Sequence, residues 1–187
     1  MLDLRKVGVW AFIGSESIFF ASLISTYLVY EGRSTSGPGP GDTLSIPLTS
    51  VSTFVLLMSS LLMVLALAAT QRGDTRWSRI WLLGTAALGM VFLGGQAYEF
   101  HHFYHEGLAL QTNLFGQTFY TLVGFHGAHV TVGVIWLLVL ARASFAGQLP
   151  AKRSLAVELC GLYWHFVDVV WIVIFTLVYL LKGAVGP

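Results

Sequence analysis

Long apolar stretches alternate with short polar segments along the whole of this chain. Five of the stretches are long enough to cross about 30 Å of hydrocarbon as α-helices, which rise by about 1.5 Å per residue. We expect these helices at about residues 4–30, 48–70, 77–98, 117–141 and 155–181. The segments between them carry the Gly, Pro and polar residues that are typical of loops. The pattern therefore predicts an all-α, polytopic membrane helix bundle, with residues 1–187 forming a single membrane domain.

Composition agrees with this fold class and excludes several others. Hydrophobic residues make up 56% of the 187 positions and charged residues 10%, whereas a soluble domain carries about 25% charged residues. The formal net charge is +1 and the cations are scattered, so we expect no nucleic-acid partner. The single cysteine, Cys160, excludes a disulfide framework and a thiolate metal cluster, and we expect it to be a packing residue.

The distribution of Lys and Arg predicts how the helices are oriented. With the N-terminus in the cytoplasm, eight cations fall on the inner side and only Arg33 and Lys182 on the outer side. Cytoplasmic loops of membrane proteins carry such an excess. We therefore expect an N-in, C-out topology. The eight inner cations are Arg5, Lys6, Arg72, Arg76, Arg79, Arg142, Lys152 and Arg153.

Two of the predicted connections stand out in composition. Residues 31–47 are rich in Gly, Pro, Ser and Thr, which indicates an irregular, exposed loop. Residues 99–116 contain three histidines, and we expect a solvated or partner-facing loop at the outer interface. His101 and His105 are four residues apart, a spacing that would suit a metal ion if the segment were helical. We expect a loop instead, and hence no metal ion there.

The candidate chemistry lies in ionisable residues within the apolar spans. A charge or imidazole at bilayer depth is costly unless it is paired, so such residues usually face a protein interior. Counting along the helices places Glu16, His129, His165 and Asp168 about halfway across, with His126 one turn further out. Residues three apart on a helix share a face. His126 and His129 therefore share a face of the fourth helix, and His165 and Asp168 share a face of the fifth. We therefore predict a polar cluster built from the first, fourth and fifth helices.

Three kinds of site could use this cluster. A bis-histidine haem site needs imidazoles on opposing helices, and a metal site would accept two imidazoles and a carboxylate. The third possibility is a hydrogen-bonded network that holds the helices together, and we favour it because nothing else in the chain resembles a cofactor cradle. The small residues Gly124 and Gly127 beside the histidines would permit close helix approach. We predict that at least one of the three histidines contacts Glu16 or Asp168.

The remaining polar residues of the spans are expected to contact neighbours. Gln96 and Glu99 lie one turn apart near the outer end of the third helix and should hydrogen-bond an adjacent helix. Glu158 could pair with the basic turn at the inner interface. No nucleophile, phosphate loop or haem-attachment motif is recognisable. Possible contacts with lipid or with other subunits are Gln96, Glu99, Arg153, Glu158, Trp164 and Trp171.

Four phrases of the sequence resemble subunit III of the haem-copper oxidases. They are Phe-Ile-Gly-Ser-Glu-Ser-Ile-Phe-Phe at 12–20, Gln-Ala-Tyr-Glu at 96–99, Gly-Phe-His-Gly-Ala-His-Val at 124–130 and Tyr-Trp-His-Phe-Val-Asp-Val-Val-Trp at 163–171. They cover four of the five helices in the order of that family. The chain is similar to its short, five-helix bacterial form, which lacks the two N-terminal helices of longer members.

The resemblance implies an accessory subunit that packs directly on subunit I, together with subunit II and other subunits, in the bacterial plasma membrane. Haem and copper would then belong to the partner subunits and not to this chain. It further implies phospholipid binding and a role in sustaining proton uptake and turnover while the complex reduces O2 to water and pumps protons. Glu16 matches a buried carboxyl of the family, Glu99 an outer-side glutamate, and Glu158 the glutamate before the last histidine motif.

Two other functions are weighed against this one. An accessory subunit of a nitric oxide reductase belongs to the same superfamily. A small proton-coupled transporter would require inverted repeats or broken helices, and the sequence has neither. The electron donor of the complex, cytochrome c or quinol, is left open by the sequence.

Overall fold

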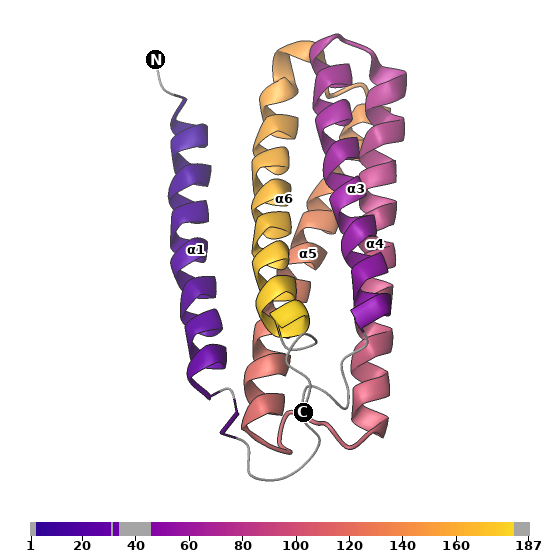
Figure 1. Ribbon diagram of the computed structural model, residues 1–187. Coiled ribbons are helices and arrows are strands. Elements are labelled where there is room, and N and C mark those ends of the chain that lie inside the picture. The colour runs from indigo at the N-terminus through magenta and orange to yellow at the C-terminus, as the bar shows by residue number, and fades with distance from the viewer. Residues whose placement is uncertain (1–2, 31, 34–45, 182–187) are drawn as a thin grey trace.

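The computed structural model describes residues 3–30, 32–33 and 46–181, and within these residues every regular element is helical (Figure 1). The long helices are α1 (Leu4–Tyr30), α3 (Ile46–Gln71), α4 (Thr75–His105), α5 (Leu114–Phe145) and α6 (Ser154–Phe175). A short 3-10 turn, η1 (Ala151–Arg153), precedes α6, and a π-helical turn, η2 (Thr176–Leu180), extends it. Within the described ranges, five helical stretches are long and apolar enough to cross a membrane, which confirms the predicted fold class.

Helix ends are set by local signals that the apolar pattern does not contain. The Asp74 side chain accepts a hydrogen bond from the backbone N–H of Trp77 and caps α4, and Asn113 caps α5 in the same way through Gly116. After α4, Gly107 has a φ of 86°, a left-handed conformation that glycine adopts without steric cost. These signals fix where the chain leaves and re-enters the bundle.

The prediction of a loop over residues 99–116 is wrong at both ends, because α4 continues to His105 and α5 begins at Leu114. Polar side chains end the apolar pattern at Tyr98, but no Pro or Gly lies between Tyr98 and Gly107 to interrupt the helix. The helix, which is held by backbone hydrogen bonds, therefore extends beyond the end of its apolar stretch. For the same reason α5 exceeds the predicted 117–141 at both ends. Of the exposed loop expected at 31–47, residues 31 and 34–45 lie outside the described residues.

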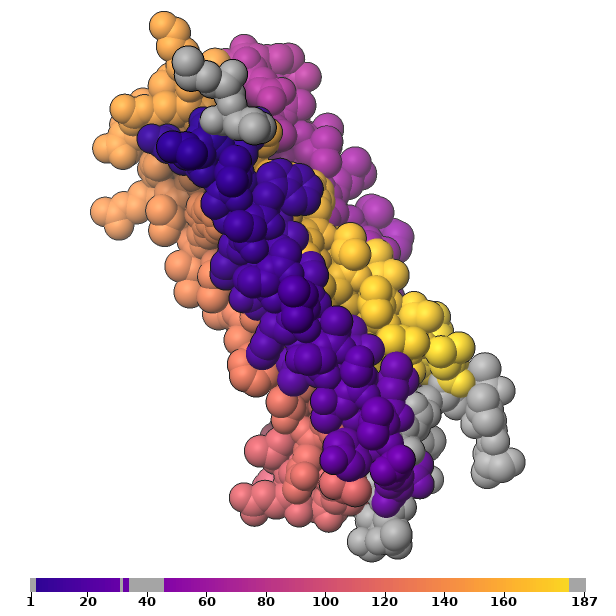
Figure 2. Space-filling view, turned by 90° about the vertical axis from the view of Figure 1, so that its left-hand side faces the viewer, coloured from indigo at the N-terminus to yellow at the C-terminus, as the bar shows by residue number. Residues whose placement is uncertain are grey.

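Four helices form the body of the bundle, and α1 lies beside them (Figure 1). α3 packs on α4 and α6, α5 packs on α4 and α6, and α1 contacts α5 and α6. Figure 2 shows α1 running diagonally across the face formed by these two helices. Only Phe20 and Tyr27 of α1 are buried, whereas Trp10 and Ile18 are exposed. Most of the surface of α1 is thus available to lipid or to another chain.

The centre of the bundle is built around the indole of Trp164 on α6. A Cβ atom added at Gly89 on α4 or at Gly133 on α5 would lie 2.7 Å from this ring. The two glycines therefore leave the space that a fully buried tryptophan fills between three helices. Cys160, one turn earlier on α6, is also fully buried.

The cations counted on the inner side gather at one end of the bundle. The start of α1, the turn between α3 and α4, and the turn between α5 and α6 lie together at the top of Figure 1. Arg5 and Arg72 come from the first two of these segments, Arg142 from the last turn of α5, and Lys152 from η1. The N-in, C-out topology that this arrangement favours stays a prediction.

Candidate functional site

The phrase at 163–171 forms a set of hydrogen bonds between α6 and α3. The indole N–H of Trp164 donates to the hydroxyl of Ser59, and that of Trp171 donates to the hydroxyl of Thr53, both over 2.9 Å. The two helices run antiparallel, so positions later on α6 meet positions earlier on α3 (Figure 1). Each buried indole N–H thus has an acceptor on the neighbouring helix.

Between these two contacts, Ser60 joins two of the predicted cluster residues. Its hydroxyl donates to Oδ2 of Asp168 and lies 2.9 Å from Nδ1 of His165. Because a hydroxyl carries one proton, Nδ1 of His165 is then the donor to Ser60. The structure therefore brings His165 and Asp168 together through a serine of α3.

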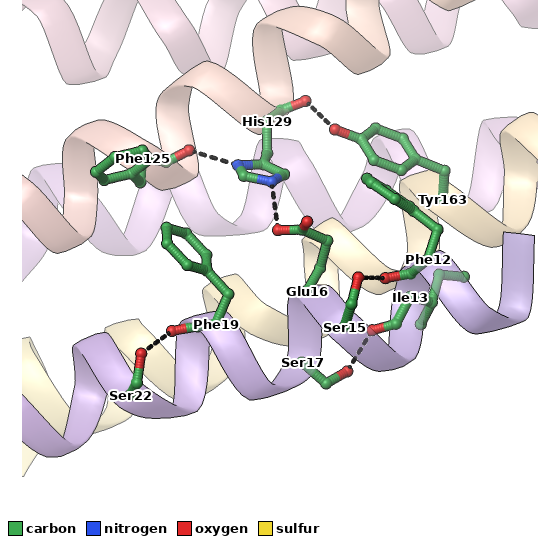
Figure 3. Close-up of polar contacts among 10 residues, drawn as sticks. All are labelled: Phe12, Ile13, Ser15, Glu16, Ser17, Phe19, Ser22, Phe125, His129 and Tyr163. Carbon is green, nitrogen blue, oxygen red and sulfur yellow. Dashed lines mark hydrogen bonds and ion pairs between the residues drawn. The ribbon is translucent and has the colours of Figure 1, made fainter.

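A second polar contact joins α1 to α5 (Figure 3). Nε2 of His129 lies 3.1 Å from Oε2 of Glu16, and the two side chains are 17% and 21% exposed. Nδ1 of the same ring lies 2.8 Å from the backbone oxygen of Phe125, one turn earlier on α5. The hydroxyl of Tyr163 on α6 donates to the backbone oxygen of His129 over 2.9 Å. The predicted contact between a histidine and a carboxyl is confirmed by this pair.

Aromatic rings enclose the Glu16–His129 pair. The ring of Phe20 meets the imidazole edge to face at 4.9 Å, and Phe19 meets Phe125 in the same way at 5.1 Å. These rings exclude solvent from part of the contact and join the same two helices. The pair is consequently a polar contact set in an aromatic seam between α1 and α5.

His126 lies apart from both polar contacts. Its ring is fully buried, stacks on Trp171 at 4.8 Å and receives the edge of Phe92 at 5.8 Å. Among the described residues, neither of its ring nitrogens has a hydrogen-bond partner.

The five predicted cluster residues are therefore divided among three places instead of forming one group. Counting along the helices gave their depth, but depth does not say which neighbour each helix face meets. Across the described part of the chain, no three His, Cys, Asp or Glu side chains are grouped as metal ligands.

Four of the six residues considered for lipid or subunit contacts lie inside the bundle. The amide of Gln96 donates to the backbone oxygen of Val123 on α5 over 2.8 Å, and Glu99 accepts from Thr49 on α3. A Cβ atom at Gly127 would lie 2.7 Å from that amide, so the glycine makes room for it. The four buried residues are Gln96, Glu99, Trp164 and Trp171, which leaves Arg153 and Glu158 on the surface.

The basic end of the bundle holds a pocket of about 450 Å³ between α1, α5 and α6. Three cations, Arg5, Lys152 and Arg153, line it together with Trp136 and Leu159. Beside it, Nζ of Lys6 lies 2.6 Å from Oε1 of Glu158, an ion pair that ties α1 to α6. Glu158, which was expected to pair with the basic turn, pairs instead with a cation at the start of α1.

The hydroxyl acceptors on α3 were missed by sequence reasoning. Thr53, Ser59 and Ser60 lie in an apolar span, where serine and threonine commonly bond to the carbonyl of the preceding turn. Thr53 and Ser59 do make such bonds, to the carbonyls of Thr49 and Leu56. The spacing of seven between Thr53 and Ser60 was the available signal, since it places both on one helix face.

Comparison with known proteins adds family information to this geometry. The family model described as cytochrome c oxidase subunit III matches residues 3–182. Cytochrome c oxidase subunit 3 of Bacillus sp. (strain PS3) is 40% identical over 182 residues, which are 97% of this chain and 87% of that protein. Quinol oxidase subunit 3 of Bacillus subtilis (strain 168) is 39% identical over 95% of this chain and 87% of its own length. Cytochrome c oxidase subunit 3 of Synechocystis sp. is 43% identical, with 96% and 76% covered.

Proposed function

We propose that this chain, which belongs to the cytochrome c oxidase subunit III family, is the accessory subunit of a proton-pumping bacterial haem-copper oxidase. The chain is a multi-pass protein of the bacterial plasma membrane. Members of the family generally carry no haem or copper, which other subunits of the complex hold. The observation that carries the proposal is the family match over residues 3–182, which includes all five long helices.

In the proposed complex the chain packs directly on subunit I, with subunit II in the same assembly. The large apolar side chains on α1 and on the outer face of α5 support a protein contact within the membrane. Such side chains include Trp10, Ile18, Val132, Ile135 and Val139. The aromatic seam and the Glu16–His129 contact hold α1 against the bundle, so that α1 and α5 can present one continuous surface.

The pocket lined by Arg5, Lys152 and Arg153 is the proposed phospholipid site. Three cations at one end of a membrane bundle attract an anionic headgroup, and the apolar walls accept the start of the acyl chains. The Lys6–Glu158 ion pair keeps α1 in place beside the pocket. An anionic phospholipid there would bridge α1 and α6, and so stabilise the subunit during turnover.

The lipid site is tested by counting phospholipids that copurify with the complex. Replacing Arg5, Lys152 and Arg153 together by Gln should lower the anionic lipid retained per haem by about one molecule, because the headgroup loses its counter-charges. Arg72→Gln with Arg76→Gln removes exposed cations from the same end, outside the pocket, and should change nothing. Equal lipid loss in both variants would contradict a specific site.

The role in the complex is tested by deleting the chain and by isolating it. The complex without this chain should keep its haem spectrum and its initial rate of O2 reduction, and its rate should decline during sustained turnover. Adding the chain back should restore a constant rate. The chain purified alone in detergent should contain no haem and no copper.

Three results would contradict the proposal. One is a stoichiometric haem on the isolated chain, and another is the loss of the haem spectrum on deletion. The third is a partner complex that reduces nitric oxide but not O2, which would favour the reductase alternative. The assay supplies both cytochrome c and quinol, because the similar proteins are named for both donors.

A further inference from the structure

The end of α4 carries two histidines whose rings meet outside the bundle. Because α4 is helical to His105, His101 and His105 lie on one face of its last turns. Their Nε2 atoms are 3.2 Å apart, the ring centroids are 4.5 Å apart, and both residues are exposed. This arrangement has no part in the contacts that hold the helices together.

The distance between the two nitrogens suits one metal ion bound to both. Zinc binds imidazole nitrogen at about 2.0–2.1 Å in tetrahedral geometry, which places two ligand nitrogens about 3.3 Å apart. The observed 3.2 Å also suits the N–H···N hydrogen bond that the two rings make with each other. A zinc ion would take the place of the shared proton without moving the backbone of α4.

We propose that His101 and His105 form a two-histidine zinc site at this end of the bundle, with water completing the coordination. The nearby carboxyl of Glu106 is engaged by His102 over 3.2 Å, so it stays with that ring and supplies no third ligand. An exposed site with two protein ligands exchanges its ion freely with the solvent. It is accordingly a site for a labile ion and separate from any redox centre of the complex.

The rest of the chain offers little competition for the ion. Of the other four histidines, His102 is held by Glu106, and the remaining three lie within the bundle. These three are His126, His129 and His165, and the last two already make hydrogen bonds there. The single cysteine thiol is buried. We therefore expect one zinc ion per chain.

The experiment titrates zinc chloride into the full chain in detergent, purified through a tag without histidine, and follows the heat of binding. Wild type should bind one ion. His101→Gln and His105→Gln should each weaken binding by at least about tenfold, since even outer-shell changes at metal sites cost that much. His102→Gln is the matched control on the same turn and should bind within about twofold of wild type. Binding should weaken on acidification, because protons compete for the same nitrogens.

A second measurement uses wild type alone, so that the test does not depend on the variants folding. With ¹⁵N-labelled histidine, zinc should shift the ring resonances of two exposed histidines and leave those of His126, His129 and His165 unchanged. The proposal is wrong if wild type binds no zinc. It is also wrong if His102→Gln loses as much affinity as His105→Gln, or if the shifted rings belong to the bundle interior.

Discussion

Glu16 and His129 can exist as a pair in two protonation forms, and in both forms one proton lies between the two side chains. Nδ1 of His129 faces a backbone oxygen, which can only accept, so Nδ1 carries a hydrogen. The remaining nitrogen, Nε2, faces the carboxyl of Glu16 over 3.1 Å. Either Nε2 also carries a hydrogen and donates to a carboxylate, or the carboxyl is protonated and donates to Nε2. Both forms keep one proton between α1 and α5, and both depend on a hydrogen bond at this point.

Substitutions of Glu16 test whether that hydrogen bond or the acidity of the carboxyl matters. Glu16→Gln keeps the shape and an N–H donor for Nε2, so the variant should assemble and show a near-normal initial rate. Glu16→Ala removes the contact and should weaken the docking of α1 by about 1 kcal/mol, roughly a fivefold change in its equilibrium. We expect this to appear as a rate that declines during turnover in lipid.

The measurement compares the initial rate and its decay for both variants of the reconstituted complex. Ser17→Ala is the matched control, since its hydroxyl bonds only to the carbonyl of Ile13 on the same helix. A Gln variant without initial activity beside an active Ala variant would show that the carboxyl does more than join two helices.

At the residue scale the sequence predicted which side chains need partners but not what those partners are. The cost of an imidazole or carboxyl at bilayer depth pointed to His129 and Glu16, and the structure pairs them. The same reasoning predicted that Asp168 needs a partner, but it could not identify Ser60 as that partner. A serine in an apolar span is not costly enough to mark it as a residue that needs a partner. His126 was expected in a polar cluster and instead stacks on Trp171. Depth follows from counting residues, whereas the facing side chain depends on how each helix is rotated.

Helix α6 makes hydrogen bonds to two of its neighbours. It presents Trp164 and Trp171 to hydroxyls on α3 and Tyr163 to a carbonyl of α5, so neighbouring faces of the helix hold two different helices. The phrase at 163–171 that suggested a site is therefore largely a packing surface. Its bulk is matched by the absence of side chains at Gly89 and Gly133.

This match predicts opposite effects for two glycines of α5. Gly133→Ala places a methyl group 2.7 Å from the Trp164 ring, within a rigid and fully buried contact. We expect a loss of about 1–3 kcal/mol, the usual cost of overpacking a core. Gly124→Ala meets no atom within 4 Å and should be neutral or stabilise the helix by up to about 1 kcal/mol.

Thermal unfolding of the two variants in the same detergent distinguishes them. The Gly133→Ala midpoint should fall and the Gly124→Ala midpoint should not. A smaller ring at 164 should relieve part of the strain, so Trp164→Phe should cost less in the Gly133→Ala background than in wild type. Equal midpoints for the two alanine variants would contradict the packing argument.

At the scale of the elements, the apolar pattern predicted five helices and located each of them. It made α4 and α5 too short by about two turns each. It ended the third helix at residue 98 because His101, His102 and Glu106 are polar, yet α4 needs only backbone hydrogen bonds to continue to His105. Apolarity reports what surrounds a helix, and the helix ends are set by Gly107 and by caps such as Asp74 and Asn113. That extension is also what brings His101 and His105 onto one face.

At the scale of the whole molecule, the sequence predicted a helix bundle but not which helix lies beside which. Among the described residues, α1 packs mainly on α5 and α6, and it buries little of its own surface. A helix that faces lipid is apolar on every side, so its composition cannot show which side meets protein. The ion pair between Lys6 and Glu158 and the pocket beside it depend on this placement. Neither the ion pair nor the pocket could be predicted from the sequence, because the sequence does not show where α1 lies against the other helices.

The charge distribution predicts how the whole bundle is oriented in the membrane. Eight of the ten cations lie at the end formed by the start of α1 and the turns 72–74 and 146–150, which favours that end in the cytoplasm. In a Cys160→Ser background, Gln111→Cys and Gln148→Cys each place a thiol at an exposed position, at opposite ends of the bundle. A membrane-impermeant thiol reagent added to intact cells should label the Gln111→Cys thiol and reach the Gln148→Cys thiol only after the membrane is opened. Both should react in detergent, which controls for accessibility, and the opposite pattern in cells would mean that charge bias does not set the topology of this chain.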